Sequence, residues 1–161
     1  MSSKGNHRGG SGEPMLLVHG ITDTWRTWQL ALPYLEPHRD CLAVTLLGHS
    51  GGRALGPDGA TTLAELVDEA ERDMDAAGFE TAHIVGNSLG GWIALELAAR
   101  GRARSVLALS PAGGWDPGDR WALATYWQLV VQQRMLALTK PAALSLASRP
   151  RGRWLVLGGL V

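Results

Sequence analysis

Four short apolar runs constrain the fold of this chain more than any other feature of its sequence. Each run has the length of a strand, ends at a turn residue and is apolar throughout instead of alternating with polar positions. This pattern is typical of strands that are buried on both faces of a parallel sheet. The runs are MLLV (15–18), CLAVTLL (41–47), AHIV (82–85) and SVLALS (105–110).

Segments with helical spacing separate these runs. Residues 62–78 carry their apolar side chains on one helical face, begin with a Thr62–Glu65 capping box and stop at Gly78. Residues 24–35 and 89–100 also have helical spacing, and Pro33 predicts a bend or a restart in the earlier segment. Strands that alternate with helices predict βαβ units, and so an α/β fold with a parallel sheet.

The two ends of the chain differ from this core. Residues 1–13 are polar and rich in glycine, so we expect a flexible N-terminal segment there. After Pro111 a loop leads to a predicted helix over 120–138, which Lys140-Pro141 ends, and a short helix is expected over 141–148. No fifth strand-like run follows the fourth.

The charge of the chain argues against some partners. Its fifteen basic and fifteen acidic side chains cancel, which argues against a nucleic-acid partner for the chain as a whole. Six basic residues and no acidic one follow Asp119. We favour an acidic surface within the same fold as the partner of this basic segment. An anionic membrane surface or ligand is the alternative.

Cysteine content and hydropathy bear on location. Cys41 is the only cysteine, so no intrachain disulfide forms, and we expect a small buried hydrophobe at this position. Residues 1–14 contain no apolar secretory segment, and the longest apolar run, WLVLGGLV at 154–161, is too short to cross a bilayer. We therefore expect a cytoplasmic protein with no transmembrane segment; the oligomeric state stays open.

The third apolar run ends in GNSLG (86–90), a G-x-S-x-G pattern at the seam of a predicted strand and helix. The carboxyl ends of parallel strands are where reactive groups gather. A nucleophile elbow holds its serine in a strained backbone conformation, so that the Oγ of Ser88 would project above the sheet. Side chains at Gly86 and Gly90 would collide with such a turn. Ser88 as a mere helix cap is the structural alternative.

Two main-chain N–H groups are candidates to stabilise negative charge beside Ser88. The N–H of Leu89 lies in the first turn of the predicted helix, where amides have no acceptor within the helix. The second donor is expected from His19-Gly20-Ile21, directly after the first apolar run, where a glycine permits close backbone approach. The N–H of Ile21 is the natural candidate.

Four segments in family-like order and spacing resemble the α/β-hydrolase superfamily, in its lid-bearing branch of esterase-like and cofactor-free haloperoxidase-like enzymes. They are LLVHG (16–20), LLGHSGG (46–52), HIVGNSLGGWIALELAARG (83–101) and VLALSPAGG (106–114). The resemblance implies an incomplete parallel sheet of the hydrolase type over 14–115, the nucleophile half of the core. It also implies a partial helical cap over 116–161.

The resemblance further implies a serine hydrolase that cleaves a small apolar ester or similar acyl substrate through an acyl-enzyme, with no cofactor and no metal. Ser88 would be the nucleophile, and Leu89 and Ile21 would form the oxyanion hole. His19 and Gly20 would order the oxyanion loop. The tryptophans near the cap could also line an apolar pocket; they are Trp115, Trp121 and Trp127.

The base that should activate Ser88 is missing from this pattern. The family runs its triad in the order serine, acid, histidine, and no histidine follows Ser88. Asp116 is a weak candidate for the acid, because the family more often places it one strand later. We therefore expect a fragment, with the acid and the histidine beyond residue 161. A natural short homologue that binds without catalysing is the alternative.

The remaining motifs have structural interpretations. His49 is expected to organise its loop, His83 to be a satisfied core histidine, and His7 and His38 to lie on the surface. Phosphate binding at the glycine turn is discounted, because the turn lacks the lysine of a P-loop.

Overall fold

The computed structural model describes residues 5–57 and 59–114, together with eleven single residues of the C-terminal part. These are residues 120, 124, 125, 127, 128, 131, 134, 135, 138, 139 and 145. The chain divides into two units, Met1–Gly113 and Gly114–Val161, and each is described by itself. The eleven single residues are helical, while the rest of the predicted cap over 116–161 lies outside the described residues.

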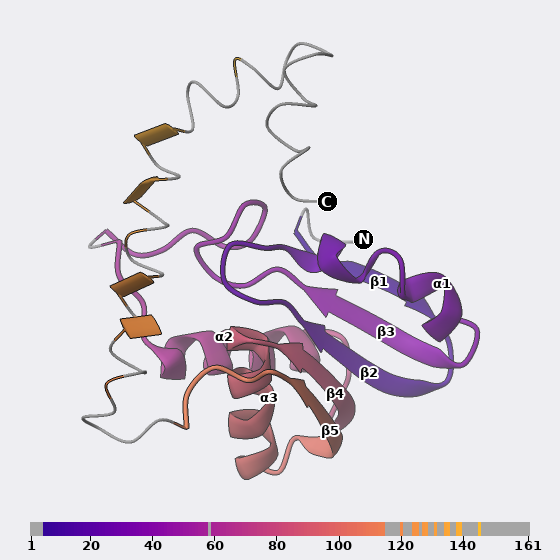
Figure 1. The fold of residues 1–161 in the computed structure, drawn as a ribbon. Helices are drawn as coiled ribbons and strands as arrows, with labels where there is room; N and C mark the ends of the chain where they lie inside the picture. Colours follow the sequence, from indigo (N-terminus) through magenta and orange to yellow (C-terminus); the bar gives the residue numbers. More distant parts are fainter. Residues whose placement is uncertain are drawn as a thin grey trace. The chain divides into compact units, whose positions relative to one another are not determined.

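A five-stranded sheet forms the centre of the first unit (Figure 1). Its strands are β1 (His7–Gly10), β2 (Glu13–Val18), β3 (Arg39–Val44), β4 (Ala82–Asn87) and β5 (Ala103–Leu109), in the order β1-β3-β2-β4-β5. Strands β2 to β5 pair in parallel, and β1 pairs antiparallel with β3. The four apolar runs are thus four parallel strands, and the predicted α/β class is confirmed.

Strand β1 corrects the expectation of a flexible segment over residues 1–13. Its sequence, HRGG, has no apolar pattern, so nothing local predicts a strand. Main-chain pairing with β3 holds it, aided by ion pairs of His7 with Glu36 (2.6 Å) and of Arg8 with Asp40 (2.7 Å). These partners lie about thirty positions away in the sequence, which is why only the folded chain reveals the strand.

The helices lie where the spacing predicts them. α2 (Leu63–Ala76) begins with the predicted capping box, in which Thr62 and Glu65 exchange side-chain to main-chain hydrogen bonds. α3 (Leu89–Ala99) starts directly after Ser88. The segment 24–35 divides into a 3₁₀ turn, η1 (Trp25–Trp28), and a single helical turn, α1 (Leu32–Leu35). Pro33 lies in the first turn of α1, so it restarts the helix as predicted.

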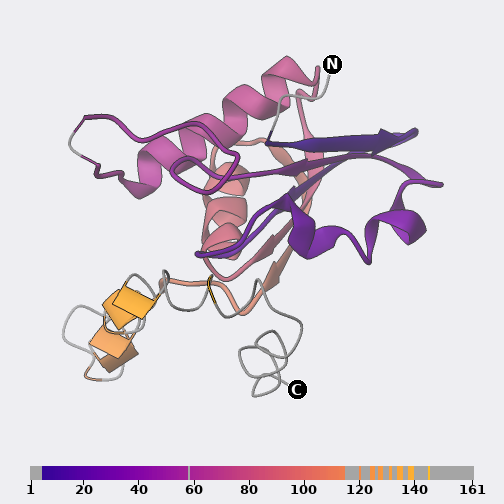
Figure 2. The same cartoon turned by 90° about the horizontal axis from the view of Figure 1, so that it is seen from above.

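The sheet is buried on both faces over its central strands. α2 and α3 cover one face and η1 and α1 the other, as Figure 2 shows. Leu16 and Leu42 belong to the α2–α3 side, whereas Leu17 and Cys41 belong to the η1–α1 side. Cys41 is a buried free thiol, and burial raises its pKa to about 11. The central strands therefore show no polar alternation, because neither of their faces meets water.

Helices of the described residues are all too short or too polar to cross a bilayer.

Candidate active site

Ser88 lies at the seam of β4 and α3, and its backbone is strained. Its φ of 53° and ψ of −114° are values that residues with a side chain rarely adopt. Main-chain hydrogen bonds hold its peptide groups. Its N–H donates to the carbonyl of Leu109, and its own carbonyl accepts the N–H groups of Gly91 and Ala112, each at 2.9 Å. The strain is thus maintained by segments from β5, α3 and the loop after β5.

The side chain of Ser88 makes no capping hydrogen bond to α3. Ser88 therefore occupies the N-cap position of α3 without capping the helix through its side chain. The residue is half-buried.

The glycines of the serine turn, as we call residues 86–90, are sterically required. A Cβ at Gly86 would overlap the carbonyl of Gly90, and a Cβ at Gly90 would overlap the carbonyl of Val18. Both obstacles are main-chain atoms, which cannot swing aside as a flexible side chain can. Small residues at these two positions therefore follow from the close approach of α3 to β2 and β4.

The loop of residues 19–21 meets the serine turn. β2 and β4 are neighbours, with Val18 opposite Gly86. A Cβ at Gly20 would lie 3.3 Å from the Cβ of Ser88 and 3.3 Å from the Nδ2 of Asn87. The fold thus brings Gly20 of this loop against Ser88. The N–H groups of Leu89 and Ile21 as oxyanion donors stay a prediction.

His19 is buried at the base of this loop, with no exposed surface. Its Nδ1 donates to the carbonyl of Gly20 at 2.6 Å, and its Nε2 accepts the N–H of Leu46 at 3.0 Å. Burial lowers the pKa of His19, the neighbouring His49 lowers it further, and the hydrogen bond to Gly20 opposes both effects. A neutral ring with its proton on Nδ1 satisfies both contacts.

His49 packs edge-on against His19, with 5.0 Å between the ring centroids. Its Nδ1 hydrogen-bonds the carbonyl of Leu47 at 3.1 Å, within its own loop. His19 and His49 therefore both bond to main-chain groups, and neither set of contacts involves the hydroxyl of Ser88.

The other histidines of the described part lie in other surroundings. His7 pairs with Glu36 and stacks on Trp25, and His38 is exposed. His83 is half-buried rather than a core residue; its Nδ1 lies 2.8 Å from the hydroxyl of Ser105. Within the described residues no histidine is seen bonded to Ser88.

Several predicted residues lie outside the described part of the chain. Asp116, Trp115 and Trp121 are among them, so the structure does not place the weak candidate acid. Trp127 is described as an exposed helical residue of the second unit.

Sequence reasoning missed the partners that hold the 19–21 loop. Leu46 binds the ring of His19, and Asn6 binds the neighbouring Thr45 through a hydrogen bond of 2.8 Å from the Thr45 N–H to Asn6 Oδ1. These contacts span 27 and 39 sequence positions. No local sequence pattern predicts these two contacts.

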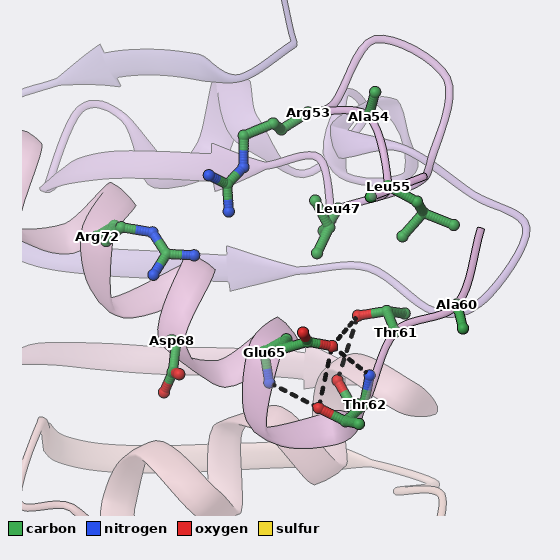
Figure 3. Close-up of a pocket in the computed structure, with 11 residues that line it drawn as sticks. Leu47, Arg53, Ala54, Leu55, Ala60, Thr61, Thr62, Glu65, Asp68 and Arg72 are labelled. Carbon is green, nitrogen blue, oxygen red and sulfur yellow. Dashed lines mark hydrogen bonds between the residues drawn. The ribbon is translucent and has the colours of Figure 1, made fainter. Parts of the chain in front are cut away.

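A hollow of about 610 Å³ lies away from the serine turn, beside the N-terminus of α2 (Figure 3). Arg53 and Arg72 reach toward it, but both also pair with Glu69. The carboxylate of Glu65 is engaged by Thr62 in the capping box. None of the residues that line it belongs to the serine turn or to the 19–21 loop, so this hollow is separate from the candidate site.

Comparison with known proteins places these features in a family. The model of the alpha/beta hydrolase family matches residues 15–159. The epoxide hydrolase EphH of Mycobacterium tuberculosis is 61% identical over 59 residues, which are 37% of this chain and 26% of EphH. The 2-hydroxymuconate semialdehyde hydrolase of Pseudomonas sp. strain CF600 is 36% identical over 113 residues, which are 66% of this chain and 39% of that enzyme.

Solved structures show the same likeness. A meta-cleavage product hydrolase from Pseudomonas fluorescens IP01 has a TM-score of 0.61 and 30% identity, covering 67% of this chain and 41% of that one. A hydrolase from Pseudomonas aeruginosa has a TM-score of 0.64 and 25% identity, covering 94% of this chain and 60% of that one. The chain spans between 26% and 48% of the length of the first curated relatives that it matches. The family match over residues 15–159 shows that this chain belongs to the alpha/beta hydrolase family.

Proposed function

We propose that Ser88 is the nucleophile of a serine hydrolase that acts on an ester or similar acyl substrate through an acyl-enzyme. The observation that carries this proposal is the strained backbone of Ser88, pressed against Gly20 with the first turn of α3 beside it. The strain has no role in helix capping, and strained residues cluster at functional sites. The N–H groups of Leu89 and Ile21 form the oxyanion hole.

The reaction follows from these roles. The Oγ of Ser88 attacks the carbonyl carbon, its proton passes to a base, and the carbonyl oxygen becomes an oxyanion held by the two amides. Collapse of this intermediate expels the alcohol with a proton and leaves an acyl ester on Ser88, which water then hydrolyses to the acid. His19 orders the 19–21 loop and is not the base, because both of its ring nitrogens are already engaged. No base for Ser88 is identified among the described residues, which include all five histidines of the sequence.

A serine hydroxyl as the nucleophile favours some classes of substrate over others. Attack by a serine hydroxyl on an acyl carbon gives an ester, which water can cleave. Attack by the same hydroxyl on an epoxide carbon gives an ether, which has no carbonyl for water to attack and would block the enzyme. Ser88 therefore favours acyl transfer. Cleavage of a carbon–carbon bond beside a carbonyl also begins at a carbonyl carbon, so it fits the same oxyanion hole.

Epoxide hydrolysis is the second candidate, because the similarity to EphH reaches 61% over 59 residues. It would require direct attack of water on the epoxide, with Ser88 as a hydrogen-bonding group instead of a covalent nucleophile. A binding module without catalysis is the candidate from another class, because no histidine follows Ser88 in this chain.

Acetylation by p-nitrophenyl acetate separates these candidates. The full chain would be incubated with the ester, with a fluorophosphonate or with styrene oxide, and the modified peptide identified by mass spectrometry. We expect acetyl and phosphonyl adducts on Ser88. Without its base the chain should retain only the contribution of the oxyanion hole, which is on the order of 10³ over water. Ser50→Ala, at an exposed serine, is the matched control for Ser88→Ala.

Loss of both adducts in Ser88→Ala but not in Ser50→Ala supports the proposal. Conversion of the epoxide to its diol, unchanged in Ser88→Ala, would instead support direct attack by water. If Ser88 reacts no faster than Ser50 with either acyl reagent, the serine-nucleophile proposal is wrong.

A further inference from the structure

A chain of contacts leads from the 19–21 loop to a polar cavity beside the end of strand β3. The ring of His19 joins the carbonyl of Gly20 to the N–H of Leu46. The residue before it, Thr45, is buried and donates its N–H to the side-chain oxygen of Asn6 at 2.8 Å. Leu46 and Thr45 are consecutive, so any shift of one main-chain group is shared by the other.

Asn6 continues this chain to α2. Its side chain hydrogen-bonds the carboxylate of Asp73, on the face of α2 that lines a cavity of about 250 Å³. The side-chain oxygen of Asn6 accepts from Thr45, and an amide nitrogen is the donor that a carboxylate such as Asp73 requires. One side chain thus links the end of β3 to a carboxylate on a helix 67 positions further along the chain.

Close main-chain packing makes this region stiff. A Cβ at Gly5 would overlap the carbonyl of Gly51, and a Cβ at Gly52 would overlap the carbonyl of Leu46. The turn at 51–52 is therefore clamped between the segment before β1 and the end of β3. Stiff packing of this kind transmits a small displacement instead of absorbing it.

We propose that Asn6 and Asp73 are positioning residues for the 19–21 loop and act on it through the end of β3 and the ring of His19. The proposal rests on the proposed function of that loop as part of the oxyanion hole. Neither residue touches the reacting atoms. Their effect is to fix where the N–H of Leu46 meets the ring, and so where the ring holds Gly20.

The protonation of Asp73 provides a way to observe this link. Burial raises the pKa of Asp73 to about 6; the hydrogen bond from Asn6 lowers it, Glu69 raises it, and Arg72 and Arg53 lower it. Ionisation of Asp73 near this pH strengthens its attraction for the amide of Asn6 and pulls that side chain toward α2. The ring of His19 should register this change while staying neutral, since burial lowers the pKa of His19.

The test is a pH titration of the histidine ring nitrogens by NMR in the ¹⁵N-labelled full chain. We expect the Nε2 resonance of His19 to shift with a midpoint near pH 6, the value for Asp73. The shift should vanish in Asp73→Asn and in Asn6→Ala. It should persist in Asp75→Asn, a control that removes an exposed carboxylate from the same helix. Asn6→Asp keeps an acceptor for Thr45 and places a second carboxylate beside Asp73, so the midpoint should rise.

Three outcomes would overturn the proposal: a resonance that does not change over this pH range in the native chain, a shift that persists in Asp73→Asn, or one that persists in Asn6→Ala. Persistence in Asp73→Asn would assign the shift to a group other than Asp73. Asn6→Ala tests the link independently if Asp73→Asn fails to fold. The readout needs no turnover. An unreactive Ser88 with the His19 shift intact refutes only the proposed function, and an acetylated Ser88 without the shift refutes only the positioning network.

Discussion

The two turns that meet at Ser88 are held in place by different means. The serine turn is fixed by main-chain sterics, with glycines where α3 approaches β2 and β4 too closely for any Cβ. The 19–21 loop is fixed by a buried histidine ring, whose partner Leu46 is 27 positions away. The sequence pattern of the first turn lies in five consecutive residues, 86–90. The second depends on where a distant strand ends, so a sequence motif describes only half of this candidate site.

The largest effect is expected when a side chain is added at a glycine of the serine turn. Gly90→Ala places a Cβ against the carbonyls of Val18 and His19, so α3 must move away from β2. We expect a loss of about 3 kcal/mol or more in the free energy of unfolding. Gly101→Ala is the matched control: its φ is 78°, but nothing lies within 4 Å of the added atom. Its cost should be about 1 kcal/mol, from backbone strain alone. Equal urea midpoints for the two variants would contradict the steric account.

Replacing the buried ring of His19 removes the contacts that hold the 19–21 loop. His19→Leu puts an apolar side chain in place of the ring. It leaves the N–H of Leu46 without its partner, and the carbonyl of Gly20 keeps only the N–H of Asp23, at 3.4 Å. The loss of these two buried hydrogen bonds should cost about 2–4 kcal/mol in the free energy of unfolding, measured with urea. His38→Leu, at an exposed position, should change stability by no more than about 0.5 kcal/mol. A His19→Leu chain as stable as the native one would show that the loop does not depend on the ring.

The pH dependence of stability in Asp73→Asn tests the contacts that lie behind the 19–21 loop. The pKa of Asp73 in the folded chain, about 6, exceeds the ordinary value of 3.8, so the folded state binds the proton more tightly. Stability therefore falls as pH rises from about 4 to 6, and the full penalty applies above that window. Asp73 is partly exposed, which reduces this penalty. Asp73→Asn should therefore raise the free energy of unfolding by about 1–2 kcal/mol at pH 7.5 and leave it unchanged at pH 3.5. Thermal unfolding at the two pH values measures this. A gain of equal size at both would assign the effect to something other than ionisation.

The smallest effect is expected at the capping box of α2, which spans four consecutive residues from Thr62 to Glu65. Thr62→Ala removes the side-chain acceptor for the N–H of Glu65 at the start of α2, which should cost about 1 kcal/mol. Thr62→Ser keeps the hydroxyl and should restore most of the loss. If the serine variant is as unstable as the alanine variant, the methyl group of Thr62 and not the capping box stabilises the helix.

Elements with local signatures were predictable. The four apolar runs became β2 to β5, and the capping box and Gly78 bounded α2, because burial on both faces and helix capping are encoded within a few positions. The steric need for Gly86 follows from local geometry, because its obstacle is the carbonyl of Gly90, whereas the need for Gly90 depends on the carbonyls of Val18 and His19 beside it. Strand β1 was not predictable, because its residues gain their structure from pairing with β3 and from the carboxylates of Glu36 and Asp40.

The sequence by itself determined the fold class, the strained turn at Ser88 and the residue that follows it, because sterics and hydrophobic burial act between near neighbours along the chain. Only the tertiary structure decided how His19 is held, that Asn6 joins the end of β3 to Asp73, and that β1 exists at all. These features rest on single hydrogen bonds and ion pairs between distant segments. Such polar contacts need exact placement, which exists only after the sheet and its two helical layers have packed.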